Sequence, residues 1–357
     1  MTNKNSKSLC MISLYRQFVR ESLKGKRLQK NGSRIRKSTI RNYENVLQLL
    51  QKFISEESFE LRIVTTTKLR KNEFKSEQNY WKNFYTRFTA FLFSKGAHDN
   101  YVGSIITNIK VFFNYIEQEK NISISGLHKK FFVLQNEPPI YTLDEQQLQQ
   151  LIYEKVFEQR LDYLQKLTKD IFVFGATVAL RISDLMNLKQ HNILEVNGNV
   201  YLRTSSIKTN TFSQVKLPEY ALQIISKYHN KRGYFLFPHI YLNTFNDHLK
   251  EIGELAGWTH LVEKQRFKRG LVANASNMKM RFCDLMSSHM MRKTAITNML
   301  VHQMDETIVR KISGHAPGSK EFYRYVNYAQ TLIDDKTDHY FEAISQPKNM
   351  QKNMKIV

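Results

Sequence analysis

The chain has 357 residues, of which 41% are hydrophobic and 12% aromatic, and its formal net charge at pH 7 is +22. This length exceeds what one hydrophobic core usually organises and the composition is globular, so we expect two folded domains and exclude a disordered chain. The large positive excess predicts a polyanionic partner such as nucleic acid.

Cysteine usage and hydropathy indicate where the protein works. Cys10 and Cys283 lie far apart and in no metal-ligand spacing, which excludes a disulfide framework and a cysteine-based zinc site. The longest apolar run, Ile171–Leu180, is far shorter than the roughly 20 residues of a membrane span. We therefore expect a soluble protein of a reducing intracellular compartment, with no membrane partner.

The first 50 residues are the most basic part of the chain, because their lysines and arginines are opposed only by Glu21 and Glu44. Glycine and asparagine within residues 24–37 predict a turn or mobile connection between helices. A helix is expected from about Ser38, and its apolar face is formed by Tyr43, Val46, Leu47, Leu50 and Phe53. A basic loop beside such a helix could clamp DNA phosphates.

Apolar residues recur at helical spacing twice more, over Phe84–Leu92 and Ile105–Ile116, with Gly96 and a polar turn between the two runs. We interpret their aromatic residues as core and not as a platform that stacks on bases. The first domain is therefore expected to be a helical domain of four or five helices.

A proline pair marks the expected domain boundary, because Pro138 and Pro139 cannot continue a helix. A pattern typical of a capping box, Thr142 followed by Glu145, predicts a new helix directly afterwards. We predict a helical DNA-binding domain, a catalytic domain and a tail over residues 1–136, 137–345 and 346–357.

Arg181 is the first candidate site residue of the second domain. It follows an apolar stripe that is expected to be buried: Leu161, Leu164, Ile171, Phe174 and Val178. It also precedes an expected helix start at Ser183. A guanidinium in this place needs an anionic partner, because burying it alone is costly. An ion pair with Asp184 and a phosphate of a ligand are both open as that partner.

A small β-sheet is expected next, with strands Val200–Thr204 and Gln214–Leu217 and with Lys208 in the turn between them. Taken alone, a lysine in a turn is usually only a solvated charge. Helices are expected to follow at about 219–230 and 242–256.

A helix expected from Ser287 carries His289 and Arg292 three residues apart, and therefore on one face. A different face, which suits burial, carries Met291, Ala295 and Met299. Asp305 is then expected to cap a short helix that ends at His315.

These residue types suit cleavage of a phosphodiester without metal. Arg181 and Arg292 could hold the phosphate oxygens, because a guanidinium meets them in a bidentate manner and stays charged. A tyrosine could attack the phosphorus with His289 or His315 as acid–base group, and Lys208 could protonate the leaving oxygen. The sequence has no HExxH pattern, acidic cluster or phosphate-binding glycine loop, so we expect no cofactor, neither a metal ion nor ATP.

Taken in order, Ala179–Leu185, Ile207–Thr209, His289–Arg292, Ser313–His315 and a following tyrosine resemble the signature of the tyrosine recombinases, the phage integrase family. The resemblance covers residues of about 140–330. It implies a mainly α fold with a small β-sheet, in which a helical core-binding domain precedes a mixed α/β catalytic domain. It also implies a site-specific DNA recombinase, the integrase of a bacterial mobile element, acting in the cytoplasm at the nucleoid.

The resemblance implies the same roles for the two arginines and for Lys208, with His289 as the acid–base group and His315 as a support for the phosphate. Tyr325 would attack to form a 3′-phosphotyrosine, which lets strands rejoin without ATP. Family members act as tetramers on two double-stranded DNA sites, and an accessory DNA-bending protein is a further partner to consider. The segment Leu332–Val357 would pack onto a neighbouring protomer.

The choice of nucleophile rests on spacing. The family's tyrosine usually follows the motif histidine by nine or ten residues, which favours Tyr325, ten residues after His315, over Tyr323 and Tyr328. Tyr323 and Tyr325 point to different sides of a helix, so only one of them can reach the phosphate.

Other functions of this fold stay open. A DNA invertase of the same family is a close variant, and a non-catalytic DNA-binding protein is the rival class. The completeness of the six-residue set argues against the rival. A type IB topoisomerase is a third alternative, which would relax supercoils without needing two sites and contacts between protomers.

Overall fold

The computed structural model describes residues 8–205, 212–228, 234–272 and 279–345. The chain divides into two compact units, each with a hydrophobic core of its own. Unit 1 is Met1–Pro138 with Gln265–Met278, and unit 2 is Pro139–Lys264 with Lys279–Val357. The prediction of a mainly helical fold with small sheets is confirmed.

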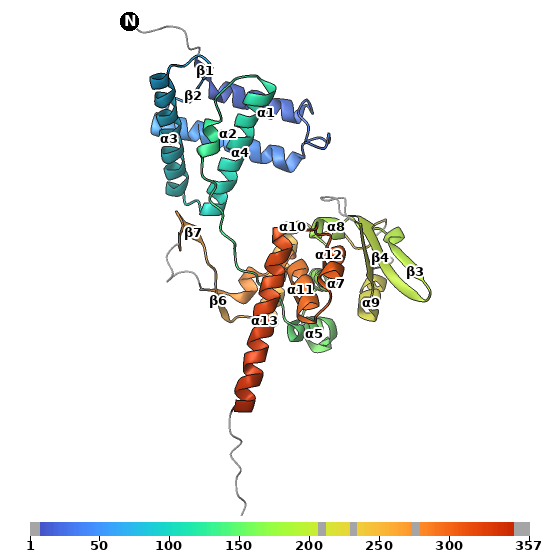
Figure 1. Cartoon of the computed structure of the whole chain (residues 1–357). Helices are drawn as coiled ribbons and strands as arrows, with labels where there is room; N and C mark the ends of the chain where they lie inside the picture. The colour runs from blue at the N-terminus through green and yellow to red at the C-terminus, as the bar shows by residue number, and fades with distance from the viewer. Residues whose placement is uncertain (1–7, 206–211, 229–233, 273–278, 346–357) are drawn as a thin grey trace, which may run out of the picture. The chain divides into compact units, whose positions relative to one another are not determined.

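Unit 1 is built on four long helices, which Figure 1 shows in blue to green: α1 (Met11–Leu23), α2 (Lys37–Glu57), α3 (Lys71–Ser94) and α4 (Asp99–Glu119). Its shorter elements are β1 (Ser8–Cys10), β2 (Arg62–Val64), the 3-10 helix η1 (Leu127–Lys130), β7 (Phe267–Lys268) and β8 (Leu271–Val272). Aromatic rings fill the core, where Phe53 contacts Phe84, Phe88 and Phe91 edge to face. The interpretation of the aromatic residues as core is therefore confirmed.

The short strand β2 pairs antiparallel with β1, with Leu9 opposite Ile63. The basic connection between α1 and α2 is not uniformly exposed. Arg27 is 8% exposed, its guanidinium lies over the Phe18 ring, and its Nε pairs with Glu119 at 3.3 Å. Arg27 therefore belongs to the packing of unit 1.

The β7–β8 hairpin comes from the later part of the chain but packs within unit 1. Asp99, at the start of α4 and 1% exposed, anchors it. One carboxylate oxygen accepts the backbone N–H of Arg269 at 2.6 Å and the other that of Gly270 at 2.8 Å. The second oxygen also accepts from the Asn136 side chain at 3.0 Å.

Unit 2 contains the remaining elements. Its helices are α5 (Glu145–Tyr153), α6 (Lys155–Gln159), α7 (Tyr163–Val178), α8 (Ile182–Leu185), α9 (Glu219–Lys227), α10 (Leu242–Leu255), α11 (Ser288–Val301), α12 (Glu306–Ser313) and α13 (Lys320–Ser345). Its strands are β3 (Ile193–Val196), β4 (Asn199–Ser205), β5 (Phe212–Lys216), β6 (Leu261–Glu263) and β9 (Lys279–Arg281), and its 3-10 helices are η2 (Gln190–Asn192) and η4 (Phe282–Leu285).

Helix α7 is the centre of unit 2, because most of its residues from Leu167 onward are buried and it packs directly on α11. Gly175 permits this close approach, since a Cβ there would overlap the sulfur of Met291. The contact is the reason the end of α7 and the start of α11 can bring their polar side chains together.

The sheet beside this core has three antiparallel strands in the order β3-β4-β5, one more than the sequence predicts. Two other local predictions are wrong. The cap of α5 is Asp144, paired with Gln147, and not Thr142. Leu164, expected in the buried stripe, is 47% exposed. None of the described helices combines the length and apolar composition needed to cross a membrane.

Candidate active site

Arg181 is positioned by the end of α7. The helix stops because Ala179 adopts the left-handed conformation, with φ of 56°, and the chain then turns into the short helix α8. Arg181 stands at the N-cap of α8, with its side chain 22% exposed and Nη1 3.9 Å from Oδ2 of Asp184. The ion pair considered from the sequence is present but long, and the guanidinium remains partly open to solvent.

Arg292, on α11, is 2% exposed and is the second guanidinium of the site. Its Nη1 donates to the carbonyl oxygen of Ala179 at 2.7 Å, and its Nη2 lies 3.2 Å from Nε2 of His315. Desolvation, followed by the charge of Arg181, lowers the pKa of Arg292 to about 10. It therefore stays a cation at neutral pH, held next to another cation.

The two candidate histidines lie around these guanidinium groups. His289 is exposed on α11, and His315 is half-buried after the left-handed Gly314 that ends α12. Desolvation, then Lys293 and Arg292, lowers the pKa of His289 to about 4. Desolvation, then the two guanidinium groups and His289, lowers the pKa of His315 to about 3. Both imidazoles are therefore neutral in the free protein at pH 7 and can accept a proton.

Tyr325 and Tyr323 differ sharply in environment. Tyr325 is 1% exposed, and its ring centroid lies 5.9 Å from that of His315, whereas Tyr323 is 46% exposed. Burial and the charge of Glu321 raise the pKa of Tyr325. The charges of Arg292, Arg324 and Arg181 act in the opposite direction. The buried phenol is thus the one that stands among the other candidate residues.

The structure brings five of the six predicted residues together, since each influences the charge state of others in the set: Arg181, His289, Arg292, His315 and Tyr325. The sixth, Lys208, lies outside the described residues. The strand that follows it is tied to α12, because Ser213 Oγ donates to the carbonyl oxygen of Ile312 at 2.7 Å. The start of β5 is therefore hydrogen-bonded to the helix that leads to His315.

Sequence reasoning assigned no role to two neighbours of this set, Ser313 and Glu321. Ser313 is 2% exposed and hydrogen-bonds His315. The charge of Glu321 partly opposes the lowering of the His289 pKa and contributes to the raised pKa of Tyr325. Its position four residues before Tyr325 on α13 was the available signal, because such residues share a helix face.

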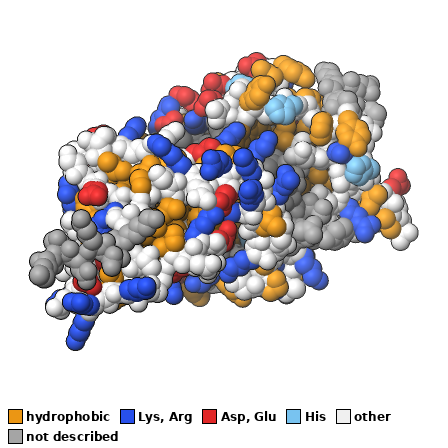
Figure 2. Space-filling view, turned by 90° about the horizontal axis from the view of Figure 1, so that it is seen from above, with side chains coloured by type: hydrophobic (Ala, Val, Ile, Leu, Met, Phe, Trp, Pro, Cys, Tyr) orange, Lys and Arg blue, Asp and Glu red, His pale blue; other side chains and the backbone are white. Residues whose placement is uncertain are grey.

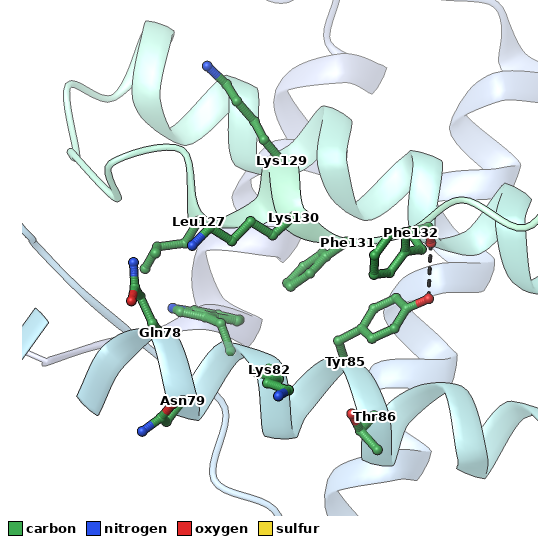
Figure 3. A pocket seen from close by; sticks show the side chains of 11 residues that line it. Gln78, Asn79, Lys82, Tyr85, Thr86, Leu127, Lys129, Lys130, Phe131 and Phe132 are labelled. Atoms are coloured by element: carbon green, nitrogen blue, oxygen red, sulfur yellow. Dashed lines mark hydrogen bonds between the residues drawn. The ribbon is translucent and has the colours of Figure 1, made fainter. Parts of the chain in front are cut away.

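The described residues contain no group of three His, Cys, Asp or Glu side chains that could hold a metal ion. A pocket in unit 1 lies between α3 and the segment that starts with η1; Figure 3 shows Tyr85 and Phe131 along it, with the Tyr85 hydroxyl donating to the Phe132 carbonyl oxygen at 3.2 Å. None of the predicted catalytic residues lines this pocket.

Several solved structures of DNA recombinases have a similar fold. XerH site-specific recombinase bound to difH substrate is 12% identical with a TM-score of 0.54, over 89% of this chain and 82% of that one. The Tn1549 transposon integrase in complex with circular intermediate DNA is 14% identical with a TM-score of 0.56, over 89% and 95%. A lambda integrase tetramer bound to a Holliday junction is 11% identical with a TM-score of 0.54, over 90% and 78%. At these identities the likeness shows a shared fold.

The family comparison goes further, because the model of the phage integrase family matches residues 142–331, more than half of the chain. No curated protein matches the sequence. The protein is thus a tyrosine-type site-specific DNA recombinase, of the class that cuts and rejoins strands through a 3′-phosphotyrosine. The chain belongs to the phage integrase family, as the sequence motifs predict.

Proposed function

We propose that the residues gathered at α7, α11, α12 and α13, together with Lys208, are the catalytic site that cleaves and rejoins double-stranded DNA. The observation that carries the proposal is the buried guanidinium of Arg292 beside Arg181, with the Tyr325 phenol and the His315 imidazole next to it. A phosphodiester between these two cations would stabilise both of them, because its non-bridging oxygens can accept hydrogen bonds from both guanidinium groups.

The first chemical step forms one bond and breaks one. The oxygen of Tyr325 attacks the scissile phosphorus, while Arg181 and Arg292 hold the non-bridging oxygens. The bond from phosphorus to the 5′ oxygen breaks, and Lys208 gives that oxygen its proton. The phenol proton passes to His289, which is neutral in the free protein. In the return step the 5′ hydroxyl of another strand attacks the phosphotyrosine, so that no ATP is needed.

The proposal includes the oligomeric state of the protein, its partners and its place in the cell. We take the working form to be a homotetramer on two recombination sites, with an accessory DNA-bending protein as a candidate further partner. The basic first 50 residues favour a mobile-element integrase over an invertase, because they could grip a second class of DNA site. DNA as substrate places the work in the bacterial cytoplasm, at the nucleoid.

The test begins by sequencing the DNA that becomes covalently attached to the protein, which gives the recombination site. A nicked half-site of that DNA then traps the covalent adduct. Tyr325→Phe should abolish the adduct, whereas the matched variant Tyr323→Phe should keep it, because only the buried phenol stands among the guanidinium groups. Adduct formed by Tyr325→Phe at the wild-type rate would overturn the assignment.

A second measurement separates the alternative functions. A plasmid that carries two of these sites should be inverted, or have the intervening DNA deleted, according to the orientation of the sites, with little change to a plasmid that lacks them. Relaxation of any supercoiled plasmid by the monomer would identify a topoisomerase. Site-specific binding without adduct would identify a non-catalytic DNA-binding protein.

A further inference from the structure

Ser313 links the last turn of α12 to His315. Its Oγ lies 2.7 Å from the carbonyl oxygen of Val309, one helical turn earlier, and 2.8 Å from Nδ1 of His315. The residue is 2% exposed, so water does not compete for the hydroxyl. A hydroxyl has one proton, and the carbonyl oxygen can only accept it. The Ser313 proton therefore goes to Val309, and its oxygen accepts from His315.

The Arg292 guanidinium lies against the same imidazole and is consistent with this assignment. Its Nη2 is 3.2 Å from Nε2 and 3.4 Å from Nδ1 of His315, and a guanidinium can only donate, so Nε2 is the acceptor left to it once the Nδ1 proton points to Ser313. A proton on Nε2 would face the guanidinium N–H with a second donor. The network is satisfied throughout when Nδ1 carries the proton and Nε2 is bare. The hydrogen bond at one ring nitrogen thus decides whether the other ring nitrogen carries a proton.

We propose that Ser313 is a positioning residue that holds His315 in the Nδ1–H tautomer, so that Nε2 is the atom that takes up a proton and donates to a non-bridging oxygen of the scissile phosphate. This inference rests on the proposed function. In the free protein Nε2 faces Arg292, and arrival of a phosphate oxygen gives the guanidinium a better acceptor. The imidazole then gains a proton at Nε2 and becomes a third donor to the phosphate.

The surroundings of His315 decide when that proton is gained. Arg292 and His289 act on it from α11, Arg181 acts from the start of α8, and the Tyr325 ring packs against it from α13. At neutral pH the charged groups that act on it in the free protein are therefore the guanidinium groups of Arg292 and Arg181, which oppose its protonation. A phosphate placed between the guanidinium groups offsets part of their positive charge, which favours protonation of His315 at Nε2.

The first measurement reads the tautomer directly. Nitrogen-15 NMR of the DNA-free, histidine-labelled protein at pH 7, with His315→Gln to assign the signal, should show a protonated Nδ1 and a bare Nε2. Ser313→Ala should give a mixture of tautomers. Ser313→Thr should restore the wild-type signal, since it keeps the hydroxyl. The matched control is Ser213→Ala, which removes a buried serine bond to the neighbouring carbonyl oxygen of α12 and should leave the His315 signal unchanged.

The second measurement reads the consequence for the reaction. On the nicked half-site, Ser313→Ala should form adduct about tenfold more slowly, as expected for one lost orienting hydrogen bond, with its pH profile displaced from that of the wild type. Ser313→Thr should recover most of the rate and the wild-type profile. A wild-type His315 that carries its proton on Nε2, or a Ser313→Ala profile that superimposes on the wild type, would overturn the inference. If the wild type makes no adduct at all, the proposed function fails, while the NMR result still decides the tautomer.

Discussion

Arg292 carries a charge that the free protein holds in an unfavourable setting. Its side chain is 2% exposed, and its hydrogen bonds go to a carbonyl oxygen and a neutral imidazole. Within the described part of the chain, no acidic side chain forms an ion pair with it. Burying a cation costs several kcal/mol without such a partner. The protein therefore holds this charge in place before the phosphate arrives.

Replacing Arg292 by Met should separate stability from activity. Loss of the buried charge stabilises the fold, whereas unpairing Ala179 and His315 destabilises it, so the free energy of unfolding should change by less than about 2 kcal/mol. Adduct formation should fall at least about a thousandfold, because a phosphate donor is lost. Denaturant unfolding and the half-site assay measure the two quantities. Arg310→Met, whose guanidinium lies over Phe322, serves as the control and should keep its activity. An activity loss that merely follows the unfolded fraction would assign Arg292 a structural role.

The two histidines should make DNA binding take up protons. The pKa of His289 is lowered to about 4 and that of His315 to about 3, by desolvation and then by neighbouring cations. Without DNA, these histidines are protonated at a higher pH in the unfolded state than in the folded state. The free energy of unfolding should therefore fall as the pH drops from about 6.5 toward these values. A bound phosphate raises both pKa values, so binding should tighten as the pH falls from about 8 to about 6.

Calorimetry in buffers of different ionisation enthalpy measures this uptake. The binding enthalpy should vary with the buffer in the sense of protons gained by the complex. The double variant His289→Gln and His315→Gln should show less variation. Proton release on binding, or an enthalpy independent of the buffer, would contradict the expectation.

The residue types of the site could be predicted from the sequence, because phosphate chemistry restricts them and their order resembles a family signature. Their burial and their hydrogen-bond partners could not be predicted. Burial of Tyr325 beside His315 depends on how α13 packs against α11 and α12, and the Ser313 bond depends on where α12 ends. Spacing from His315 favours Tyr325 as the nucleophile, but it could not indicate that Tyr325 is buried and Tyr323 exposed.

Helices whose apolar residues recur at helical spacing could be predicted from the sequence. The hairpin that is held by a residue far away in the chain could not. The helix expected near 242–256 is present as α10, and Asp305 caps α12 as expected. The β7–β8 hairpin has strands of two residues each and no periodicity to recognise. Its anchor, Asp99, lies 170 positions before Arg269, so no local pattern could indicate it.

The anchor gives a prediction for that hairpin. Asp99→Ala leaves the backbone N–H groups of Arg269 and Gly270 without their acceptor, so unit 1 should lose about 1–3 kcal/mol of stability. Hydrogen exchange over residues 265–272 should accelerate. Asn100→Ala removes the neighbouring side-chain bonds to Asn136 and leaves the hairpin anchored, so exchange there should stay slow. Unchanged exchange in Asp99→Ala would mean that other contacts hold the hairpin.

At the scale of the molecule, the net charge of +22 favours binding to a polyanion such as DNA. Lys and Arg side chains are spread widely over the face shown in Figure 2. Not all of them are available to DNA, since Arg27 is used inside unit 1 by Glu119 and the Phe18 ring. Lys24, Lys26 and Lys30 in the same connection are exposed. Net charge alone therefore overstates the number of phosphate contacts, and a salt titration can count them.

Binding of the whole chain to a duplex of arbitrary sequence should depend steeply on salt. Each phosphate contact releases counterions, so six or more contacts would weaken binding on the order of a thousandfold between about 50 and about 200 mM salt. Lys24→Gln, Lys26→Gln and Lys30→Gln should each lower the slope of log affinity against log salt by about one if they contact phosphates. Arg27→Gln removes the same unit of charge from a buried position, and it should lower the free energy of unfolding while leaving the slope unchanged. Fluorescence anisotropy measures the slopes. A flat salt dependence, or an Arg27→Gln effect on the slope equal to that of the exposed lysines, would contradict a clamp made by the surface of this connection.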